Sequence, residues 1–297
     1  MDTVLVTGSA GGVGAWTVDA LADAGREVVA VDRDAPPSDD RRDDVDYVAA
    51  DLTDYGETRQ VVDAAAPDAV VHLAAIPHPE DHAGSRVFAN NAESAYNVFD
   101  AAGAAGARIA WASSESCYGT VFAEGDWLPD RLPIDEETPT EPEDPYGLSK
   151  VVGEEIAASA ARRHGVSAVS LRLSWVTFPG DERLREARET FDPATADPSG
   201  NCWSYVDVRD VVAAIEAAID PETAIDGHEA VLIVAAENFL GRDTAATIEA
   251  VRGDLPAECD LRGDESVFDC AKAKRVLGWE PTHSWRDEVG DGEGHEV

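Results

Sequence analysis

The chain has 297 residues, 44% of them hydrophobic, which suffices for one large α/β domain or two unequal lobes and argues against a disordered chain. Its 60 acidic and 23 basic residues give a formal net charge of −37, which excludes nucleic acid and anionic membranes as partners at low salt. No run of about 18 apolar residues is present, and the opening MDTVLVTG lacks a basic region before an apolar segment, so we expect no membrane span and a cytoplasmic protein.

The first part of the chain alternates short apolar strands with helical patterns. The expected strands cover residues 3–7, 27–32, 45–52, 68–75, 107–114 and 168–174. Helical patterns separate several of them, at residues 15–25, 92–105 and about 146–164. Continuous apolar strands that alternate with helices are typical of a parallel sheet with helices on both faces. The sequence therefore predicts an α/β fold with a doubly wound parallel sheet of the Rossmann type.

The last third of the chain is less regular. It shows an amphipathic helix, a late strand and a short helix, at residues 205–219, 229–236 and 269–279. Residues 34–44 read as a polar loop, and residues 290–297 read as a frayed tail.

These patterns predict one domain and one lobe. We expect residues 1–174 to form the Rossmann domain, with residues 205–236 returning to it. Residues 175–204 and 237–297 would form a small C-terminal lobe that binds the substrate.

A glycine-rich turn follows the first expected strand directly. The segment VTGSAGGVG places Gly8, Gly11 and Gly14 between that strand and a helix, with Gly12 and Val13 inside the turn. Such glycines allow a tight turn, close approach of the backbone to a pyrophosphate and close packing of helix on strand. The helix start adds N–H groups and the positive end of its dipole. The pattern predicts a dinucleotide site, with an ordinary strand-to-helix turn as the alternative.

Asp32 ends the second expected strand, about where a carboxylate accepts hydrogen bonds from the adenosine ribose of a dinucleotide. A carboxylate there disfavours a 2′-phosphate, which favours NAD over NADP. Arg33 follows directly and would soften that preference. In a chain with 60 acidic residues, an aspartate in a surface turn is the plainer alternative.

Tyr146 and Lys150 stand four residues apart in DPYGLSK, which places both side chains on one face of the expected helix. The chain has three lysines and six tyrosines, so about 0.06 pairs at this spacing are expected by chance. A free phenol has a pKa of about 10, which a neighbouring ammonium and an oxidised nicotinamide both lower. Tyr146 is therefore a candidate to remove a hydroxyl proton while hydride leaves the same carbon.

The glycine turn with Tyr-x-x-x-Lys downstream resembles the extended short-chain dehydrogenase/reductase superfamily, and more closely its NAD-dependent epimerase/dehydratase family. The resemblance covers nearly the whole chain and includes HLAA at 72–75, NNAESAYN at 90–97, SSESCYG at 113–119, YVDVRDVVAAI at 205–215 and AKRVLGWEP at 273–281. It implies catalytic roles for Ser114, Tyr146 and Lys150, with Ser114 holding the substrate oxygen.

The same resemblance implies NAD as the cofactor. Asp51 and Leu52 would flank its adenine, Asn91 would lie beside its nicotinamide half, and Lys150 would also bind the nicotinamide ribose. The residues implied to bind it are Gly8, Gly11, Gly12, Val13, Gly14, Asp32, Arg33, Asp51, Leu52, Leu73, Ala74, Ala75, Asn91, Tyr146 and Lys150.

Positions at which this chain departs from the family pattern restrict the classes of substrate and reaction that we expect. Dehydratases of the family resemble one another in a Thr-Asp-Glu run, and Ser116 stands here in place of its second acid, which argues against dehydration. Where nucleotide-sugar enzymes of the family carry an asparagine and an arginine, this chain has Trp175 and Trp203. A diphosphate would lack its cation, whereas indole rings suit the apolar face of a small unphosphorylated sugar or polyol. Packing in the core is the other interpretation of both tryptophans.

Uronate dehydrogenases are small members of the superfamily and resemble this chain in their reduced substrate lobe. A uronate carboxylate needs a cation. Arg172, Arg183 and Arg185 are candidates for it, although Glu115 near the reacting centre argues mildly against a uronate.

The segment from Gly119 to Pro145 is long and contains Trp127. We expect it to form a lid over the substrate. A disordered surface loop explains the same pattern equally well.

These observations predict an enzyme, an NAD-dependent oxidoreductase acting at a secondary alcohol or hemiacetal carbon of a small sugar or sugar acid, with Tyr146 as acid and base. The first alternative is an NAD-dependent epimerase of a sugar or nucleotide sugar, which shares every catalytic residue. A non-catalytic NAD-binding sensor is the alternative from another class, and the intact Ser114, Tyr146 and Lys150 argue against it.

The alanine-rich helices, the acidic residues and the cysteines indicate how the protein assembles and in which solvent it works. The alanine-rich helices at 92–105 and 146–164 resemble those that form a four-helix interface in this superfamily, so we expect a homodimer. Acidic residues spread over the whole length resemble proteins of salt-loving archaea, in which salt screens self-repulsion. The four cysteines lack metal-ligand spacing, so we expect reduced core thiols and no metal site.

Overall fold

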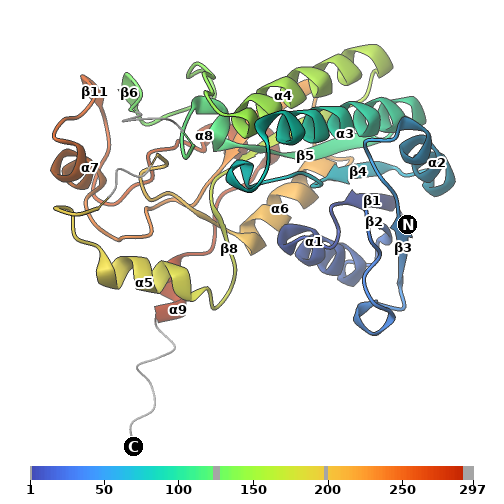
Figure 1. Ribbon diagram of the computed structural model, residues 1–297, viewed down its shortest axis with the longest axis horizontal. Coiled ribbons are helices and arrows are strands. Elements are labelled where there is room, and N and C mark those ends of the chain that lie inside the picture. The colour runs from blue at the N-terminus through green and yellow to red at the C-terminus, as the bar shows by residue number, and fades with distance from the viewer. Residues whose placement is uncertain (1, 123–127, 197–199, 290–297) are drawn as a thin grey trace, which may run out of the picture.

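The computed structural model describes residues 2–122, 128–196 and 200–289. At its centre lies a seven-stranded sheet with the spatial order β10-β7-β5-β4-β1-β2-β3 (Figure 1). Every neighbouring pair in this sheet is parallel. Its strands are β1 (Thr3–Thr7), β2 (Glu27–Asp32), β3 (Val45–Ala49), β4 (Ala69–His72), β5 (Arg108–Ser114), β7 (Ala168–Leu173) and β10 (His228–Ile233). The predicted doubly wound parallel sheet is confirmed.

Helices cover both faces of the sheet, because successive side chains of its strands point to opposite sides. Val4 and Val6 of β1 pack in one hydrophobic cluster and Leu5 in the other. Figure 1 shows the two helix layers. The first cluster includes side chains of α1 (Gly12–Asp23), α6 (Val208–Ile219) and α8 (Ala271–Leu277). The second includes side chains of α2 (Tyr55–Ala65), α3 (Gly84–Ala105) and α4 (Pro145–His164).

The smaller lobe is built around a third hydrophobic cluster, which includes Tyr118, Trp203, Phe239 and Phe268. Its short strands pair as β6 (Arg131–Leu132) with β11 (Glu258–Cys259), and β8 (Val176–Thr177) with β9 (Val206–Asp207). Its helices are α5 (Glu182–Thr190) and α7 (Thr244–Arg252), with α9 (Trp285–Val289) following. Short 3-10 turns complete the described chain at η1 (Ser38–Asp40), η2 (Pro79–Asp81) and η3 (Glu115–Tyr118).

The segment expected to form a lid is partly built into this lobe. It contributes β6, and Ile134 forms a bridge to Phe268. Trp127 and the expected tail at 290–297 lie outside the described residues. Residues 131–134 of this segment are therefore anchored in the small lobe.

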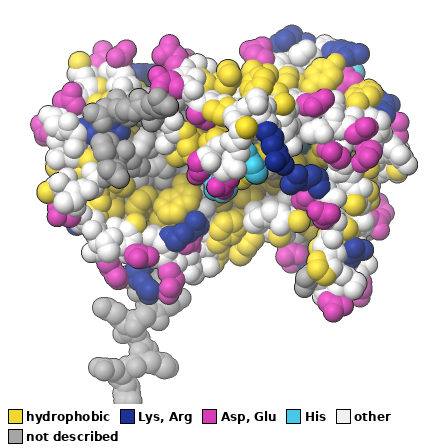
Figure 2. Space-filling model, viewed as in Figure 1, with side chains coloured by type: hydrophobic (Ala, Val, Ile, Leu, Met, Phe, Trp, Pro, Cys, Tyr) yellow, Lys and Arg dark blue, Asp and Glu magenta, His cyan; other side chains and the backbone are white. Residues whose placement is uncertain are grey.

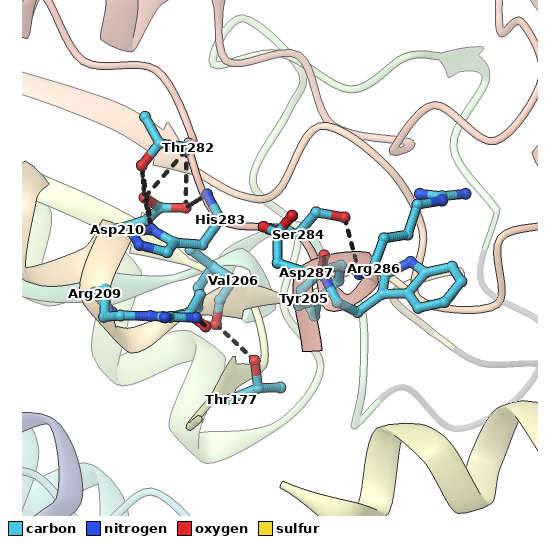
Figure 3. A network of polar contacts seen from close by, with 12 residues as sticks. Thr177, Tyr205, Val206, Arg209, Asp210, Thr282, His283, Ser284, Arg286 and Asp287 are labelled. Carbon is cyan, nitrogen blue, oxygen red and sulfur yellow. Dashed lines mark hydrogen bonds and ion pairs between the residues drawn. The ribbon is translucent and has the colours of Figure 1, made fainter. Parts of the chain in front are cut away.

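One buried carboxylate fixes the C-terminal segment to α6. Asp210 is 1% exposed and accepts hydrogen bonds from the backbone N–H groups of Thr282 and His283 and from the Thr282 hydroxyl. The ring Nδ1 of His283 lies 2.8 Å from Asp210 Oδ1. Figure 3 shows Thr282 and His283 beside this carboxylate. Trp279 Nε1 donates to the Asp210 carbonyl oxygen at 2.9 Å. The structure thus packs α8 and the residues after it against the Rossmann core, although their range was assigned to the small lobe from the sequence.

No helix within the described residues is long and apolar enough to cross a membrane.

Candidate active site

A cavity of about 850 Å³ opens at the carboxyl ends of β1, β4 and β5. The chain continues from β1 and β4 toward opposite sides of the sheet, and ligands bind at such a switch point. Figure 2 shows hydrophobic side chains gathered in the hollowed middle of this face and acidic side chains spread around it. The predicted site residues that line the cavity are Gly8, Gly11, Gly12, Val13, Gly14, Asp32, Arg33, Asp51, Leu52, Leu73, Ala74, Ala75, Ser114, Ser116, Tyr146, Lys150 and Trp175.

The glycine turn at this cavity has no room for side chains. Gly8 adopts a left-handed φ of 70°, and a Cβ there would lie 2.6 Å from the Ala74 nitrogen. A Cβ at Gly14 would lie 2.0 Å from the Gly8 carbonyl oxygen. Ala15 N donates to Gly11 O at 2.9 Å, so the N–H groups just before Ala15 precede the first intrahelical bond of α1. A bare backbone at a helix start fits the pyrophosphate of a dinucleotide.

Asp32 connects the glycine turn to the next strand end. Its Oδ2 accepts a hydrogen bond from Ala10 N at 3.0 Å, and its Oδ1 accepts one from Arg33 N at 2.7 Å. Each oxygen keeps a further lone pair for a ribose hydroxyl. Asp51 lines the same end of the cavity, and its hydrogen bonds from Thr53 lower its pKa. These carboxylates fit the adenosine half of NAD.

Local sequence places Tyr146 beside the end of β5. Asp144 caps α4 by accepting hydrogen bonds from the backbone N–H groups of Tyr146 and Gly147. A Cβ at Gly147 would lie 2.5 Å from the Ser116 carbonyl oxygen, so glycine lets the helix start approach η3 closely. Ser114 Oγ donates to Ser116 Oγ at 3.1 Å and lies close enough to the Tyr146 phenol to lower its pKa. The structure thus brings the predicted serine and tyrosine together.

Lys150 lies one helical turn after Tyr146 and is 5% exposed. Its Nζ donates to the Ala112 carbonyl oxygen at 2.7 Å and lies 5.2 Å from the centre of the Tyr146 ring. Burial lowers the pKa of Lys150 to about 8, while Glu154 opposes this shift. Burial raises the pKa of Tyr146 to about 12, with Asp144 and Glu115 adding to the shift and Ser114 opposing it. At neutral pH the site therefore holds a phenol beside an ammonium.

The arginines considered for a substrate carboxylate are engaged elsewhere. Arg172 is 6% exposed, donates to Glu154 through Nε and Nη2 at 2.9 and 2.7 Å, and donates to Tyr118 through Nη1. Arg183 pairs with Asp181, and Arg185 with Glu182. Of the described residues that line the cavity, Arg33 is the arginine and Lys150 the lysine, both predicted to bind the cofactor, and His78 is the histidine.

The substrate half of the cavity combines aromatic and polar walls. Trp175 packs edge-on against Phe239 with ring centres 5.5 Å apart, and Phe122 packs edge-on against Tyr146 at 5.9 Å. Phe122, Phe239 and Asn201 line the cavity but were not predicted from the sequence. They belong to irregular segments far apart in the chain, and no motif marks them.

Two predicted site residues do not reach the cavity wall. Asn91 is buried; its Oδ1 accepts from Ile76 N at 2.8 Å, and its Nδ2 donates to Ile76 O and to Ser149 Oγ. It ties the segment after β4 to α4, because its position on α3 turns its side chain between these elements. Trp203 packs against Phe191 in the core of the small lobe, with ring centres 5.5 Å apart.

Comparisons with known proteins agree with this geometry. Residues 4–233 match the model of the NAD-dependent epimerase/dehydratase family. An L-arabinose 1-dehydrogenase (NAD(P)(+)) from Haloferax volcanii is 36% identical over 196 residues, which cover 64% of this chain and 73% of the relative. A UDP-glucose 4-epimerase from Lactobacillus helveticus is 25% identical over 321 residues, covering 96% and 94%. A short-chain dehydrogenase/reductase superfamily protein from Agrobacterium tumefaciens, solved with bound NAD, has a TM-score of 0.71 at 27% identity, with 97% and 95% coverage.

Proposed function

This chain belongs to the NAD-dependent epimerase/dehydratase family, and we propose that it is an NAD-dependent dehydrogenase of a small, unphosphorylated and uncharged sugar. The observation that carries the proposal is the substrate half of the cavity, where Trp175 and Phe239 provide apolar walls. Among the described residues lining the cavity, Arg33 and Lys150 are the arginine and lysine side chains, and both are assigned to the cofactor, so a diphosphate or a uronate would lack an arginine or lysine of its own. The similarity to an L-arabinose 1-dehydrogenase supports the same substrate class.

The reaction follows from the placement of three side chains. When bound, NAD supplies the hydride acceptor. Ser114 hydrogen-bonds the sugar oxygen beside Tyr146, and Tyr146 removes the proton from that oxygen as hydride leaves its carbon. Lys150 favours the phenolate by its positive charge and holds the nicotinamide ribose. The products are a carbonyl compound, reduced cofactor and a proton on Tyr146.

The test is net reduction of NAD in molar KCl with L-arabinose, D-xylose, D-ribose, D-glucose, D-galactose, D-glucuronate and UDP-glucose. We expect absorbance of the reduced nicotinamide to accumulate with one or more of the neutral sugars. Tyr146→Phe should still bind NAD but lose activity by about 100-fold or more, since a general base contributes a factor of this size. Binding of NAD without reduction by any of these compounds would instead support a sensor.

A nucleotide-sugar epimerase is the second candidate, because UDP-glucose 4-epimerase relatives match about the whole chain. An epimerase re-reduces the carbon that it oxidises, so no reduced cofactor accumulates. Conversion of UDP-glucose to UDP-galactose, with no neutral sugar reducing NAD, would establish this alternative and overturn the dehydrogenase proposal.

We further propose a homodimer through α3 and α4 and a cytoplasmic location. Tyr96 and Leu148 are apolar side chains exposed by 50% and 44% on these helices, which supports burial against a second copy. All four cysteines are free, which suits a reducing compartment. Sedimentation in molar KCl should give the mass of a dimer, and a monomer at micromolar concentration would contradict the assembly.

A further inference from the structure

Two buried residues of the cavity wall carry polar side-chain atoms that lack a well-formed hydrogen bond to any described residue. Glu115 and Ser174 are 2% and 5% exposed, and both line the cavity. Among the described residues, neither Glu115 Oε2 nor Ser174 Oγ has a hydrogen-bond partner of good geometry, although Ser174 lies close enough to the carboxyl group to lower its pKa. Buried polar groups in folded proteins are nearly always paired, so this juxtaposition marks a place where a polar ligand group binds.

The orientation of Glu115 is fixed by a hydrogen bond to its other oxygen. Asn201 Nδ2 lies 3.3 Å from Glu115 Oε1 and also donates to Ser204 O at 3.0 Å. Asn201 Oδ1 accepts from Trp203 N at 3.2 Å, which holds the turn that carries Asn201. Glu115 Oε2 is therefore the oxygen of this carboxyl group that remains for a ligand.

The chemistry of the pair matches a hydroxyl group. Burial raises the pKa of Glu115 to about 8, with the nearby Ser174 side chain and the hydrogen bond from Asn201 opposing the shift, so the carboxyl group is protonated at neutral pH. A carboxylic acid and a serine hydroxyl can each donate and accept, as a sugar hydroxyl does. A substrate carboxylate or phosphate would find no positive charge from these two residues.

We propose that Glu115 and Ser174 bind the hydroxyl on the carbon next to the one that is oxidised, and so select sugars that carry it. The inference rests on the proposed function, since Ser114 and Tyr146 define the reacting oxygen. Ser114, Glu115 and Ser174 line the same cavity, and Glu115 directly follows Ser114 in the chain. We therefore place the neighbouring hydroxyl of a sugar, bound with its reacting oxygen at Ser114, against Glu115 and Ser174.

The experiment compares each sugar with its 2-deoxy counterpart: D-galactose, D-glucose and D-ribose against 2-deoxy-D-galactose, 2-deoxy-D-glucose and 2-deoxy-D-ribose. Sites that hydrogen-bond a hydroxyl strongly reject analogues lacking it, so wild-type kcat/KM should favour the parent sugar by at least about 30-fold. Glu115→Ala should lower kcat/KM for the parent by a similar factor and leave the 2-deoxy sugar nearly unchanged. Glu115→Gln keeps the shape and should retain most of the preference.

Controls separate this role from a structural one. Glu136 is also a buried carboxyl group, but it accepts a hydrogen bond from Leu232 N and lies outside the cavity lining, so Glu136→Gln should keep the wild-type preference. Equal losses for parent and 2-deoxy sugars in Glu115→Ala would overturn the inference and leave the proposed function standing. No turnover of any panel sugar by the wild-type enzyme would overturn the proposed function itself.

The pH dependence of the preference for the parent sugar tests whether Glu115 donates a hydrogen bond. The wild-type preference should fall as pH rises through about 8, because ionised Glu115 no longer donates, whereas the preference of Glu115→Gln should stay level. Tyr146, Cys117 and Cys202 are the titratable groups that interact with Glu115, and burial raises the pKa of each well above this range. A ratio of kcat/KM values cancels the titration of Lys150. A wild-type preference that stays constant up to pH 9.5 would overturn the donor role.

Discussion

Tyr146 and Lys150 respond to burial in opposite directions. The tyrosine is held as a phenol, with a pKa of about 12, and the lysine loses its proton near pH 8. Oxidation requires the phenolate, so kcat/KM should rise with pH by up to about tenfold per unit between pH 6 and 8. Above about pH 8 the rise should level off, because the neutral lysine no longer favours the phenolate. Initial rates with saturating NAD check this, and a flat profile below pH 8 would contradict the role of Tyr146.

Gly14 and Gly12 give a matched test of the cofactor site. Gly14→Ala would place a Cβ 2.0 Å from the Gly8 carbonyl oxygen, which the backbone cannot relieve without opening the turn. We expect NAD affinity to fall by about 100-fold or more, equivalent to about 2.7 kcal/mol. Gly12→Ala would meet the Phe178 ring at 2.7 Å, and that side chain can rotate away, so the loss should be smaller. NADH fluorescence titration measures both, and equal losses would contradict this account.

The sequence motifs identified most residues near the cavity, but they did not predict which of those side chains point into it. The glycine turn, Asp32, Ser114, Tyr146 and Lys150 all reach one cavity, because strand ends and a capped helix start fix where their side chains lie. Their catalytic and binding roles stay predictions. Asn91 and Trp203 are turned away from the cavity by the packing of their segments, which no local pattern encodes. Phe239 enters the wall from a turn after β10, more than 60 residues past Trp175, so only the fold reveals it.

At the scale of elements, the sequence was most informative where side chains are buried on both faces. The strands of the sheet are continuous apolar runs, and β1, β2 and β5 were predicted within one residue of their observed bounds. Among the described residues, four helices were not predicted: α2, α5, α7 and α9. Few side chains of α2, α5 and α7 are apolar and buried. In α5 only Leu184 is buried among the described side chains. The start of α2 does carry a sequence signal, because Asp54 is a residue type that caps helices. In the structure its side chain accepts a hydrogen bond from Glu57 N.

The attachment of the C-terminal segment to α6 makes Asp210 a strong determinant of stability. Asp210→Ala would remove the acceptor of three part-buried hydrogen bonds, from the N–H groups of Thr282 and His283 and from the Thr282 hydroxyl, at a cost of about 1 kcal/mol each. We expect the free energy of unfolding to fall by about 3 kcal/mol. His283→Ala keeps the carboxylate and its backbone donors and should cost about 1 kcal/mol. Urea unfolding at fixed KCl concentration measures both, and an Asp210→Ala variant as stable as the wild type would refute this.

For the whole molecule, the net charge of −37 sets the response to salt. Self-repulsion of this size opposes the compact state, and salt screens it, with a Debye length of about 10 Å at 0.1 M and 3 Å at 1 M. The unfolding midpoint should therefore rise with KCl, mostly between 0.1 and 1 M. NaCl should act similarly, because screening depends on ionic strength. A midpoint that falls over this range would show that surface ion pairs, such as those of Arg42, outweigh repulsion.

The contacts of Asp210 also have a consequence for how the protein is made. Synthesis proceeds from the N-terminus, so α6 leaves the ribosome well before its hydrogen-bond donors at residues 282 and 283 exist. Until then a nascent chain carries this carboxylate and the apolar face that later receives α8 exposed to water. We therefore expect the Rossmann core to be completed only after residues 282 and 283 have left the ribosome. Truncation before Thr282 would leave a chain that depends on chaperones at this face.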